Sequence, residues 1–339
     1  MPTDRQVIDT IRSDIGRDPI VEFEQDTCVS LSLWDEQEPF RGLIRHHGDV
    51  AQQRVLDQVS KLKALRSLDI HQNWLRSLPV GLGQLKELRS LNVSSNYLGE
   101  IPEWIWGLHK LETFHAGVNN LEKVSPRIGE LTGLKVLYLH KNRLRTLPRE
   151  VLNLRGLNTL SLYFNPDAEF PLWVTDLPDI EMFSWAVNSM TRFPKEIASW
   201  KKLKYLTLAG CAFEDIEGLE QCTTLLGVRL NKGRLKKLPR DWSAMKSLRQ
   251  ITLQQNELSE LPDSFAQLHQ LQMLNIAFNN FNQLPSSIAK LPNLRWLCAH
   301  DNPWSDPSEL EQLPQGVKVV RDHPFGWQPP PIWNKLGAV

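Results

Sequence analysis

An asparagine that returns every 23 residues constrains this chain more than any other feature. The interval is kept through two runs of positions, which are Asn73, Asn96, Asn119, Asn142, Asn165, Asn188, and then Asn256, Asn279 and Asn302. Between the runs Cys211 and Gly233 take the position, and the step from 211 to 233 is 22 residues. A register that holds over eleven units indicates a stack of one repeated structural unit.

The residues around each asparagine predict the local structure of the unit. In Leu134–Pro148, LKVLYLHKNRLRTLP, apolar and polar residues alternate before Asn142, and a Leu-Pro pair follows it. Alternation predicts a short strand, and successive strands would pair in parallel about 4.8 Å apart. The asparagine amide is expected to bond backbone groups of adjacent turns, which would otherwise be buried without partners.

This pattern resembles the leucine-rich repeat family, in its 23-residue type L-x-x-L-x-L-x-x-N-x-L-x-x-L-P-x-x-I-x-x-L. One repeat matches this pattern at every defined position. Its matching residues are Leu248, Ile251, Leu253, Asn256, Leu258, Leu261, Pro262, Phe265 and Leu268. Scribble-like and erbin-like scaffolds, plant Ras-group-related proteins and bacterial repeat proteins have this type. The resemblance implies an α/β solenoid of horseshoe shape, with a parallel sheet on its concave face and short helices or 3₁₀ turns on its convex face. It implies no activity, because function lies in a site and not in a fold.

Three regions are predicted along the chain. Residues 1–58 would form an N-terminal cap, residues 59–305 the eleven repeats, and residues 306–339 a C-terminal cap with a proline-rich and aromatic tail. Caps are needed because the end repeats of a solenoid would otherwise expose their core.

The N-terminal cap is expected to contain two helices and, between them, two stretches of alternating residues at 20–23 and 29–33. A first helix would run from Thr3 to about Ile15, with Thr3 and Gln6 forming a capping box. Residues 29–33 would be the strand of a degenerate first repeat. A second helix, capped by Asp49, would lead into the first full unit.

In the C-terminal region, residues 316–320 are predicted to form the last strand. The tail that follows contains Phe325, Trp327 and Trp333 among several prolines. We expect it to fold back over the cap, because disordered tails seldom contain so many aromatic residues. The alternative is a free proline-rich docking segment.

Charge and targeting signals exclude several classes of function. Thirty-nine basic and thirty-nine acidic residues give no net charge to attract nucleic acid or an anionic membrane. No apolar run approaches the ~20 residues that cross a bilayer, and the N-terminus lacks a signal sequence. The cysteines at 28, 211, 222 and 298 are not grouped at the solenoid ends, where secreted members of the family usually have disulfide caps. We therefore expect a cytoplasmic protein, or an effector exported without a Sec signal.

The outward positions of the predicted strands form the candidate binding surface. Aromatic and basic residues gather there in two groups, Tyr138, His140, Lys141, Tyr163, Phe164 and Tyr205, and then Phe278, Trp296 and His300. Because interface centres are enriched in such residues, we expect this concave surface to bind a protein partner. The alternative is that the rings only cover one another on adjacent strands.

A second apolar group is predicted on the convex side. It comprises Trp104, Trp106, Leu152, Leu172 and Trp173. We expect a monomer, and this patch is where any self-association would occur, although tryptophans at such places also pack against the next turn. Trp185 occupies an inward position, so that either the core widens there or the strand shifts its register.

Enzyme signatures are absent from the sequence. There is no glycine-rich phosphate loop, no G-x-S-x-G and no H-E-x-x-H. His115 and His140 would lie about 8 Å apart at the backbone, which is wide for a shared metal ion. Cys298 beside His300 has no acid to orient a base and is expected to be an ordinary surface thiol. We therefore predict no catalytic residue, no metal and no cofactor.

The sequence predicts that the chain is a non-enzymatic module that binds a protein partner. It predicts binding to neither nucleic acid nor a membrane. One alternative is an inhibitory or regulatory subunit of an enzyme, of the phosphatase-regulator or toxin-immunity type. Another is a bacterial effector or ligase adaptor.

Overall fold

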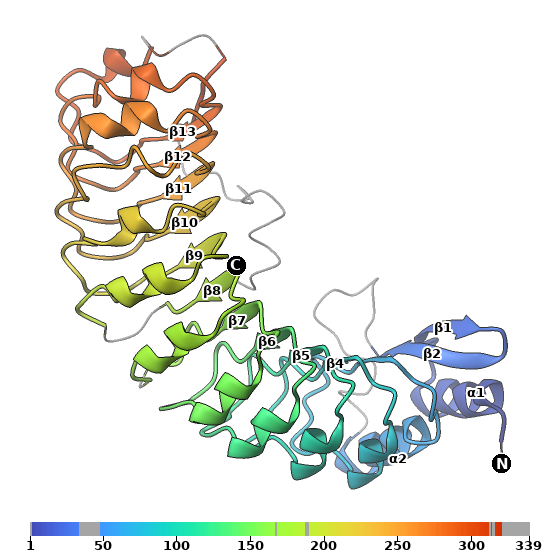
Figure 1. The fold of residues 1–339 in the computed structure, drawn as a ribbon. Helices are drawn as coiled ribbons and strands as arrows, with labels where there is room; N and C mark the ends of the chain where they lie inside the picture. The colour runs from blue at the N-terminus through green and yellow to red at the C-terminus, as the bar shows by residue number, and fades with distance from the viewer. Residues whose placement is uncertain are drawn as a thin grey trace. The chain divides into compact units, whose positions relative to one another are not determined.

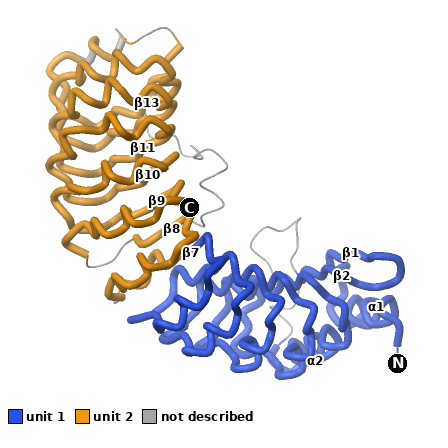
Figure 2. Tube along the Cα trace, viewed as in Figure 1, with its two compact units in different colours: residues 1–160 blue, residues 161–339 orange. Residues whose placement is uncertain are grey.

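A computed structural model describes residues 2–33, 48–166, 168–186, 190–311, 313 and 316–320. Asn188 and the predicted tail at 323–339 lie outside the described residues. The strand order in the sheet is the order of the chain, from β1 to β14 (Figure 1). The chain divides into two compact units, residues 1–160 and residues 161–339, called unit 1 and unit 2 below (Figure 2).

Unit 1 begins with a helix, a hairpin and a second helix. These are α1 (Asp4–Ile15), β1 (Ile20–Glu24), β2 (Thr27–Ser32) and α2 (Gly48–Val59). Four strands follow, β3 (Ser67–Asp69), β4 (Ser90–Asn92), β5 (Thr113–His115) and β6 (Val136–Tyr138). They alternate with the 3₁₀ turns η1 (Val80–Gln84), η2 (Glu103–Gly107), η3 (Pro126–Glu130) and η4 (Arg149–Asn153). Strand β7 (Thr159–Ser161) contains the boundary between the units.

Unit 2 continues the same alternation. Its strands are β8 (Met182–Ser184), β9 (Tyr205–Thr207), β10 (Gly227–Arg229), β11 (Gln250–Thr252), β12 (Met273–Asn275), β13 (Trp296–Cys298) and β14 (Lys318–Val320). Its 3₁₀ turns are η5 (Leu172–Asp176), η6 (Lys195–Ser199), η7 (Leu219–Gln221), η8 (Asp263–Gln267), η9 (Ile288–Lys290) and η10 (Pro307–Glu311). The predicted strand at 316–320 is confirmed by β14.

The N-terminal cap forms largely as its sequence predicts. The Thr3 hydroxyl accepts from the N–H of Gln6, the Gln6 side chain accepts from the N–H of Thr3, and Gly16 ends α1 at a φ of 68°. Strand β2 pairs in parallel with β3 and antiparallel with β1, so the degenerate first strand is also confirmed. The expected cap at Asp49 is wrong. Helix α2 already includes Gly48, and Asp49 lies in its first turn, where its charge favours the helix dipole.

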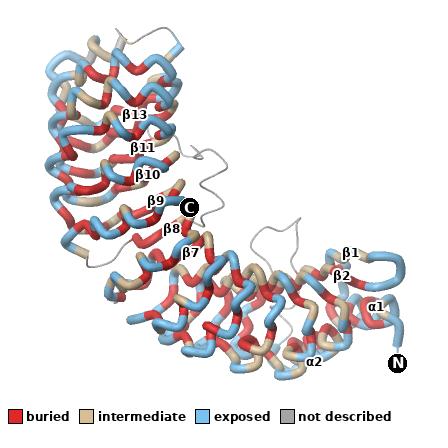
Figure 3. The backbone as a smooth tube through the Cα atoms, in the orientation of Figure 1, coloured by how far each residue is buried: buried red, intermediate tan, exposed pale blue. Residues whose placement is uncertain are grey.

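The asparagine of a repeat links that repeat to the one before it. The Asn96 Oδ1 atom accepts from the N–H of Asn73 at 3.1 Å and of Leu75 at 2.9 Å. Its Nδ2 atom donates to the carbonyls of Ile70 at 3.1 Å and Val93 at 2.9 Å. The same kind of linkage recurs at Asn119, Asn142, Asn256, Asn279 and Asn302. Backbone groups that leave the strands at these turns are therefore bonded inside the stack, as buried groups must be. Figure 3 shows where the buried residues lie along the backbone.

The two substitutions in the asparagine position behave differently. Cys211 replaces the amide with a thiol that donates weakly to the carbonyls of Trp185 at 3.8 Å and Ala209 at 3.9 Å. Gly233 has no side chain, yet it leaves no gap. A Cβ atom at Gly233 would lie 2.7 Å from the Asn256 Oδ1 atom, so the next repeat fills that space and leaves no room for a side chain.

Trp185 is accommodated without a shift in register. Its N–H donates to the carbonyl of Thr207 at 2.8 Å, and β8 pairs with β9 in the regular parallel register. The indole is buried and contacts the ring of Phe170 edge-on, with centroids 5.3 Å apart. Of the two alternatives that the sequence left open for Trp185, a shift in the register of the strand is therefore excluded.

Replacing Asn96 with alanine should lower the free energy of unfolding by about 3 kcal/mol, because it leaves buried N–H and carbonyl groups without partners. Urea denaturation followed by circular dichroism measures this. Asn293→Ala is the matched control, since Asn293 makes one exposed bond to the carbonyl of His269 and its loss should cost under about 0.5 kcal/mol. Equal losses in the two variants would show that the buried asparagine does not stabilise the stack.

Candidate binding surfaces

At the positions that the structure describes, the residue before the asparagine position adopts a left-handed backbone conformation. Its φ lies between 51° and 69° at Gln72, Ser95, Val118, Lys141, Phe164, Gly210, Lys232, Gln255, Phe278 and Asp301. Glycine, asparagine and aspartate tolerate this region, whereas a bulky or β-branched residue there is strained by about 1–2 kcal/mol. Valine and phenylalanine are therefore the least favourable choices for the backbone among these residues.

Three such residues, Val118, Phe164 and Phe278, are called the apolar rim residues here. Val118 is 36% exposed and Phe164 is 48% exposed, while Phe278 packs edge-on against His300 with ring centroids 5.1 Å apart. Both strain and exposure of apolar surface are unfavourable in the isolated protein. A residue that combines them is a candidate for contact with another molecule.

In unit 1 the outward positions place three aromatic side chains on adjacent strands. The rings of His115 and Tyr138 lie 4.4 Å apart, and those of Tyr138 and His140 lie 6.0 Å apart, both in edge-on arrangements. Gly117 makes room for the His140 ring, because a Cβ atom there would come within 2.6 Å of it. Burial lowers the pKa of both His115 and His140 to about 4, so both imidazoles are neutral at pH 7.

The same unit holds features that the sequence did not single out. The Asp69 carboxylate lies 2.6 Å from the Nδ1 atom of His71 and accepts a bond from the Asn92 amide at 3.1 Å. Trp74 and Tyr97 are exposed and follow the asparagine in two adjacent repeats. Aligning the repeats on the position after the asparagine would have found this second pair of rings.

In unit 2 the predicted residues differ in their exposure. Tyr163 is buried in a cluster with Ala186 and Ala209, and burial raises the pKa of its hydroxyl to about 12. Tyr205 is half-buried, and Trp296 is exposed. The His300 Nδ1 atom lies 2.5 Å from the Asp301 carboxylate. Phe164 and Trp296 are therefore more exposed than Tyr163. Tyr163 lies beneath the outward-facing surface of unit 2 and forms part of its floor.

Two expectations about surface residues are wrong. Trp106 is fully buried and belongs to the core of its repeat, so it cannot contribute to a convex interface. Trp104 is half-buried against Gly83 of the preceding turn, whereas Leu172 is 54% exposed and Trp173 half-buried. Cys298 is buried and not a surface thiol, and burial raises its pKa to about 11.

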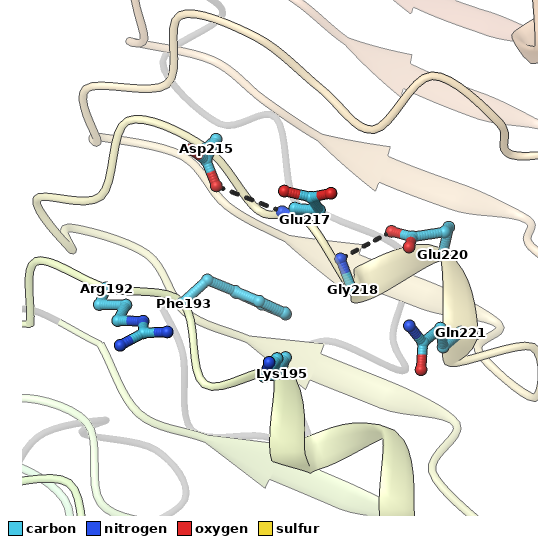
Figure 4. A pocket seen from close by; sticks show the side chains of 8 residues that line it. All are labelled: Arg192, Phe193, Lys195, Asp215, Glu217, Gly218, Glu220 and Gln221. Atoms are coloured by element: carbon cyan, nitrogen blue, oxygen red, sulfur yellow. Dashed lines mark hydrogen bonds between the residues drawn. The ribbon is translucent and has the colours of Figure 1, made fainter.

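A cavity of about 370 Å³ lies beside the 22-residue repeat (Figure 4). It is lined by Arg192, Phe193, Lys195, Asp215, Glu217, Gly218, Glu220 and Gln221. Gly218 has a φ of 103°, and its N–H donates to the Glu220 carboxylate at 2.8 Å. Asp215 accepts from the N–H of Glu217 at 3.4 Å. Two of the three carboxylates thus stabilise the turn that replaces the missing Leu-Pro, and the cavity follows from that local change.

Neither a metal site nor a membrane span is found in the part of the chain that the structure describes. No group of three or more histidine, cysteine or acidic residues there could hold a metal ion. The helices within the same residues are too short or too polar to cross a bilayer.

The architecture defines the class of protein, a solenoid of stacked strand and 3₁₀-turn units. The leucine-rich repeat family model matches residues 63–121 and 224–281, so the repeats in these segments are leucine-rich repeats. A search of curated proteins finds no match.

Solved structures with the same fold come from bacteria and plants. A leucine-rich repeat protein of Leptospira interrogans is 28% identical with a TM-score of 0.71, over 78% of this chain and 74% of that one. The plant peptide hormone receptor RGFR1 in complex with RGF2 is 26% identical with a TM-score of 0.62, over 76% of this chain and only 44% of the receptor chain. An internalin, inlF, of Listeria monocytogenes is 17% identical with a TM-score of 0.61 over 97% and 96%, which shows the fold alone.

The half-buried residues His115 and His140 should make unit 1 sensitive to acid. Their folded-state pKa values of about 4 lie below the usual 6.5, so the unfolded chain binds more protons between these values. The free energy of unfolding is then complete above pH 6.5 and falls as the pH drops toward 4, by at most about 1.4 kcal/mol per pH unit for each histidine.

Urea denaturation at pH 7 and pH 5 tests this in the variant with both His115→Gln and His140→Gln. The double variant should lose less stability between the two pH values than the unmodified protein does. His109→Gln, at an exposed histidine, is the control and should behave like the unmodified protein. An equal loss in all three proteins would contradict the effect of burial.

Proposed function

We propose that this protein binds a polypeptide partner on the outward-facing surface of its strands and does no chemistry on it. The fold commonly mediates protein–protein interaction, and its members are in general non-enzymatic. The observation that supports this role most is the presence of apolar side chains at strained, outward positions, where the fold would accept Gly, Asn or Asp at lower cost.

The proposed contacts differ between the two units. In unit 1 they are Val118 with Tyr138, His140 and Lys141, where a neutral aromatic surface lies beside an exposed lysine. In unit 2 they are Phe164, Tyr205, Phe278, Trp296 and His300, with Tyr163 as part of the floor. Rigid aromatic side chains lose little conformational entropy on binding, which suits them as anchors.

The similarity to a peptide hormone receptor that was solved with its peptide supports a polypeptide as the ligand. This chain spans less than half of that receptor, so the likeness supports the class of ligand and not the receptor's role. The neutral net charge of the chain also favours a protein over a nucleic acid.

Phe164→Asn separates binding from folding. Asparagine tolerates a φ of 58° better than phenylalanine does, so the free energy of unfolding should stay the same or rise by up to about 1 kcal/mol. The affinity for the partner, recovered by affinity purification and measured by calorimetry, should fall at least about tenfold if Phe164 is an anchor.

Leu172→Asn is the matched control, because Leu172 is also apolar, is more exposed and is located on a 3₁₀ turn. It should leave the affinity unchanged. A folded Phe164→Asn protein that binds its partner as tightly as before would remove Phe164 from the proposed surface, and the same result for Val118→Asn and Phe278→Asn would end the proposal.

A further inference from the structure

The turns that follow the asparagine position in unit 1 lie side by side along one edge of the stack. The residue after the asparagine donates its N–H to the preceding repeat, from Tyr97 to the carbonyl of Leu75 at 2.8 Å and from Arg143 to that of Leu121 at 2.9 Å. Successive turns of this backbone ladder are therefore about 4.8 Å apart. Six exposed aromatic and basic residues of these turns are called the aromatic–basic edge here, and they are Trp74, Arg76, Tyr97, Lys123, Arg143 and Arg145.

Trp74 adopts a backbone conformation that is unfavourable for so large a side chain. Its φ is 60°, whereas the other described residues that directly follow an asparagine position do not have a positive φ. A bulky residue in this left-handed region is strained by about 1–2 kcal/mol. Trp74 is nevertheless 40% exposed, and Tyr97 in the next repeat is 52% exposed. Strain that accompanies an accessible ring indicates contact with another molecule.

The positive charges of this edge are not neutralised within the protein. Its four basic side chains are exposed, and none forms an ion pair with another residue that the structure describes. On the convex side of unit 1, by contrast, Lys110 pairs with Glu87 at 2.6 Å. The edge therefore offers unpaired cations beside two exposed rings, and these cations are Arg76, Lys123, Arg143 and Arg145.

We propose that the aromatic–basic edge binds an acidic polypeptide segment of the partner. An apolar or aromatic residue of that segment would contact Trp74 and Tyr97, and its carboxylates would accept hydrogen bonds from Arg143 and Arg145, because guanidinium groups bind carboxylates in a bidentate manner. Three repeat spacings, about 14 Å, separate Trp74 from Arg143, and about four residues of extended chain cover that length.

This inference rests on the proposed function and names the chemistry of the segment that unit 1 receives. Lys141, which belongs to the proposed contacts of unit 1, lies two residues before Arg143 in the same turn. The aromatic–basic edge therefore continues the proposed contact surface without a break.

Single-stranded nucleic acid is the other kind of ligand that combines stacking on rings with binding to cations. The edge favours a polypeptide because Glu100 and Glu122 are exposed in the two repeats between Trp74 and Arg143. A nucleic acid has a negative phosphate at every nucleotide and would be repelled there, whereas a peptide can place a neutral residue opposite these carboxylates.

Fluorescence anisotropy with the full-length chain tests the proposal. The labelled probes are a random copolymer of glutamate and tyrosine, a polymer of glutamate alone, and an oligo(dT) strand. The copolymer should bind at least about tenfold more tightly than polyglutamate, because its rings contact Trp74 and Tyr97, and its affinity should fall as the salt concentration rises. Tighter binding of oligo(dT) than of the copolymer would overturn the choice of a polypeptide.

Two charge reversals of equal size locate the contact. Arg143→Glu with Arg145→Glu should weaken binding of the copolymer at least about tenfold. Arg149→Glu with Arg155→Glu changes the net charge by the same amount at exposed residues on and just after η4, and should change the affinity by less than about twofold. An equal loss in both variants would show that total charge alone governs binding and would overturn the site.

A third variant tests the two rings. Trp74→Ser with Tyr97→Ser should abolish the preference for the copolymer over polyglutamate and leave the binding of polyglutamate unchanged. A preference that persists in this variant would overturn the role of the rings. Melting temperatures check that each variant is folded.

Failure of this inference can be told apart from failure of the proposed function. Binding of the copolymer is measured without the natural partner, whereas the proposed function is tested by the affinity of that partner for the Phe164→Asn protein. If the copolymer does not bind but Phe164→Asn loses the partner, the acidic segment is overturned and the proposed function is retained.

Discussion

The structure depends on how buried backbone groups are satisfied at the end of each strand. After three residues in the sheet the chain turns away, and its N–H and carbonyl groups then point into the stack, where no water reaches them. One amide side chain per repeat supplies both an acceptor and a donor to the neighbouring turn, as Asn96 does for Asn73 and Ile70. Each repeat therefore completes the bonding of the one before it, which explains why the unit is stable only in a series.

The same turn requires a left-handed residue just before the asparagine. This requirement separates two kinds of position in each repeat. Leucines and asparagines are demanded by packing and bonding, whereas the outward residues and the left-handed residue are free to vary in chemistry. At Val118 and Phe164 the left-handed position is occupied by valine and phenylalanine, which disfavour a positive φ. Strain of this kind is more informative about function than aromatic content alone, because packing does not explain it.

The sequence alone predicted the features that follow from periodicity. The strands, the 3₁₀ turns, the asparagine linkage and the capping box at Thr3 all come from residue types at fixed spacing. What it could not give depends on the size of neighbouring side chains. Tyr163 is buried beside the small residues Ala186 and Ala209, and Trp106 is buried in the core of its repeat. The left-handed conformation of the residue before the asparagine position is a property of the backbone. It was recognised only from the φ angles of the structure.

The four cysteines can serve as probes of local unfolding in this chain. All are buried, and burial raises the pKa of Cys28 to about 11 and that of Cys222 to about 12, so thiolate is scarce in the folded state. A thiol reagent can then react only after the surrounding turns separate. Because Cys28 lies in the first cap, Cys211 and Cys222 in the middle of the series and Cys298 near its end, their labelling rates would report local breathing at three places along one solenoid.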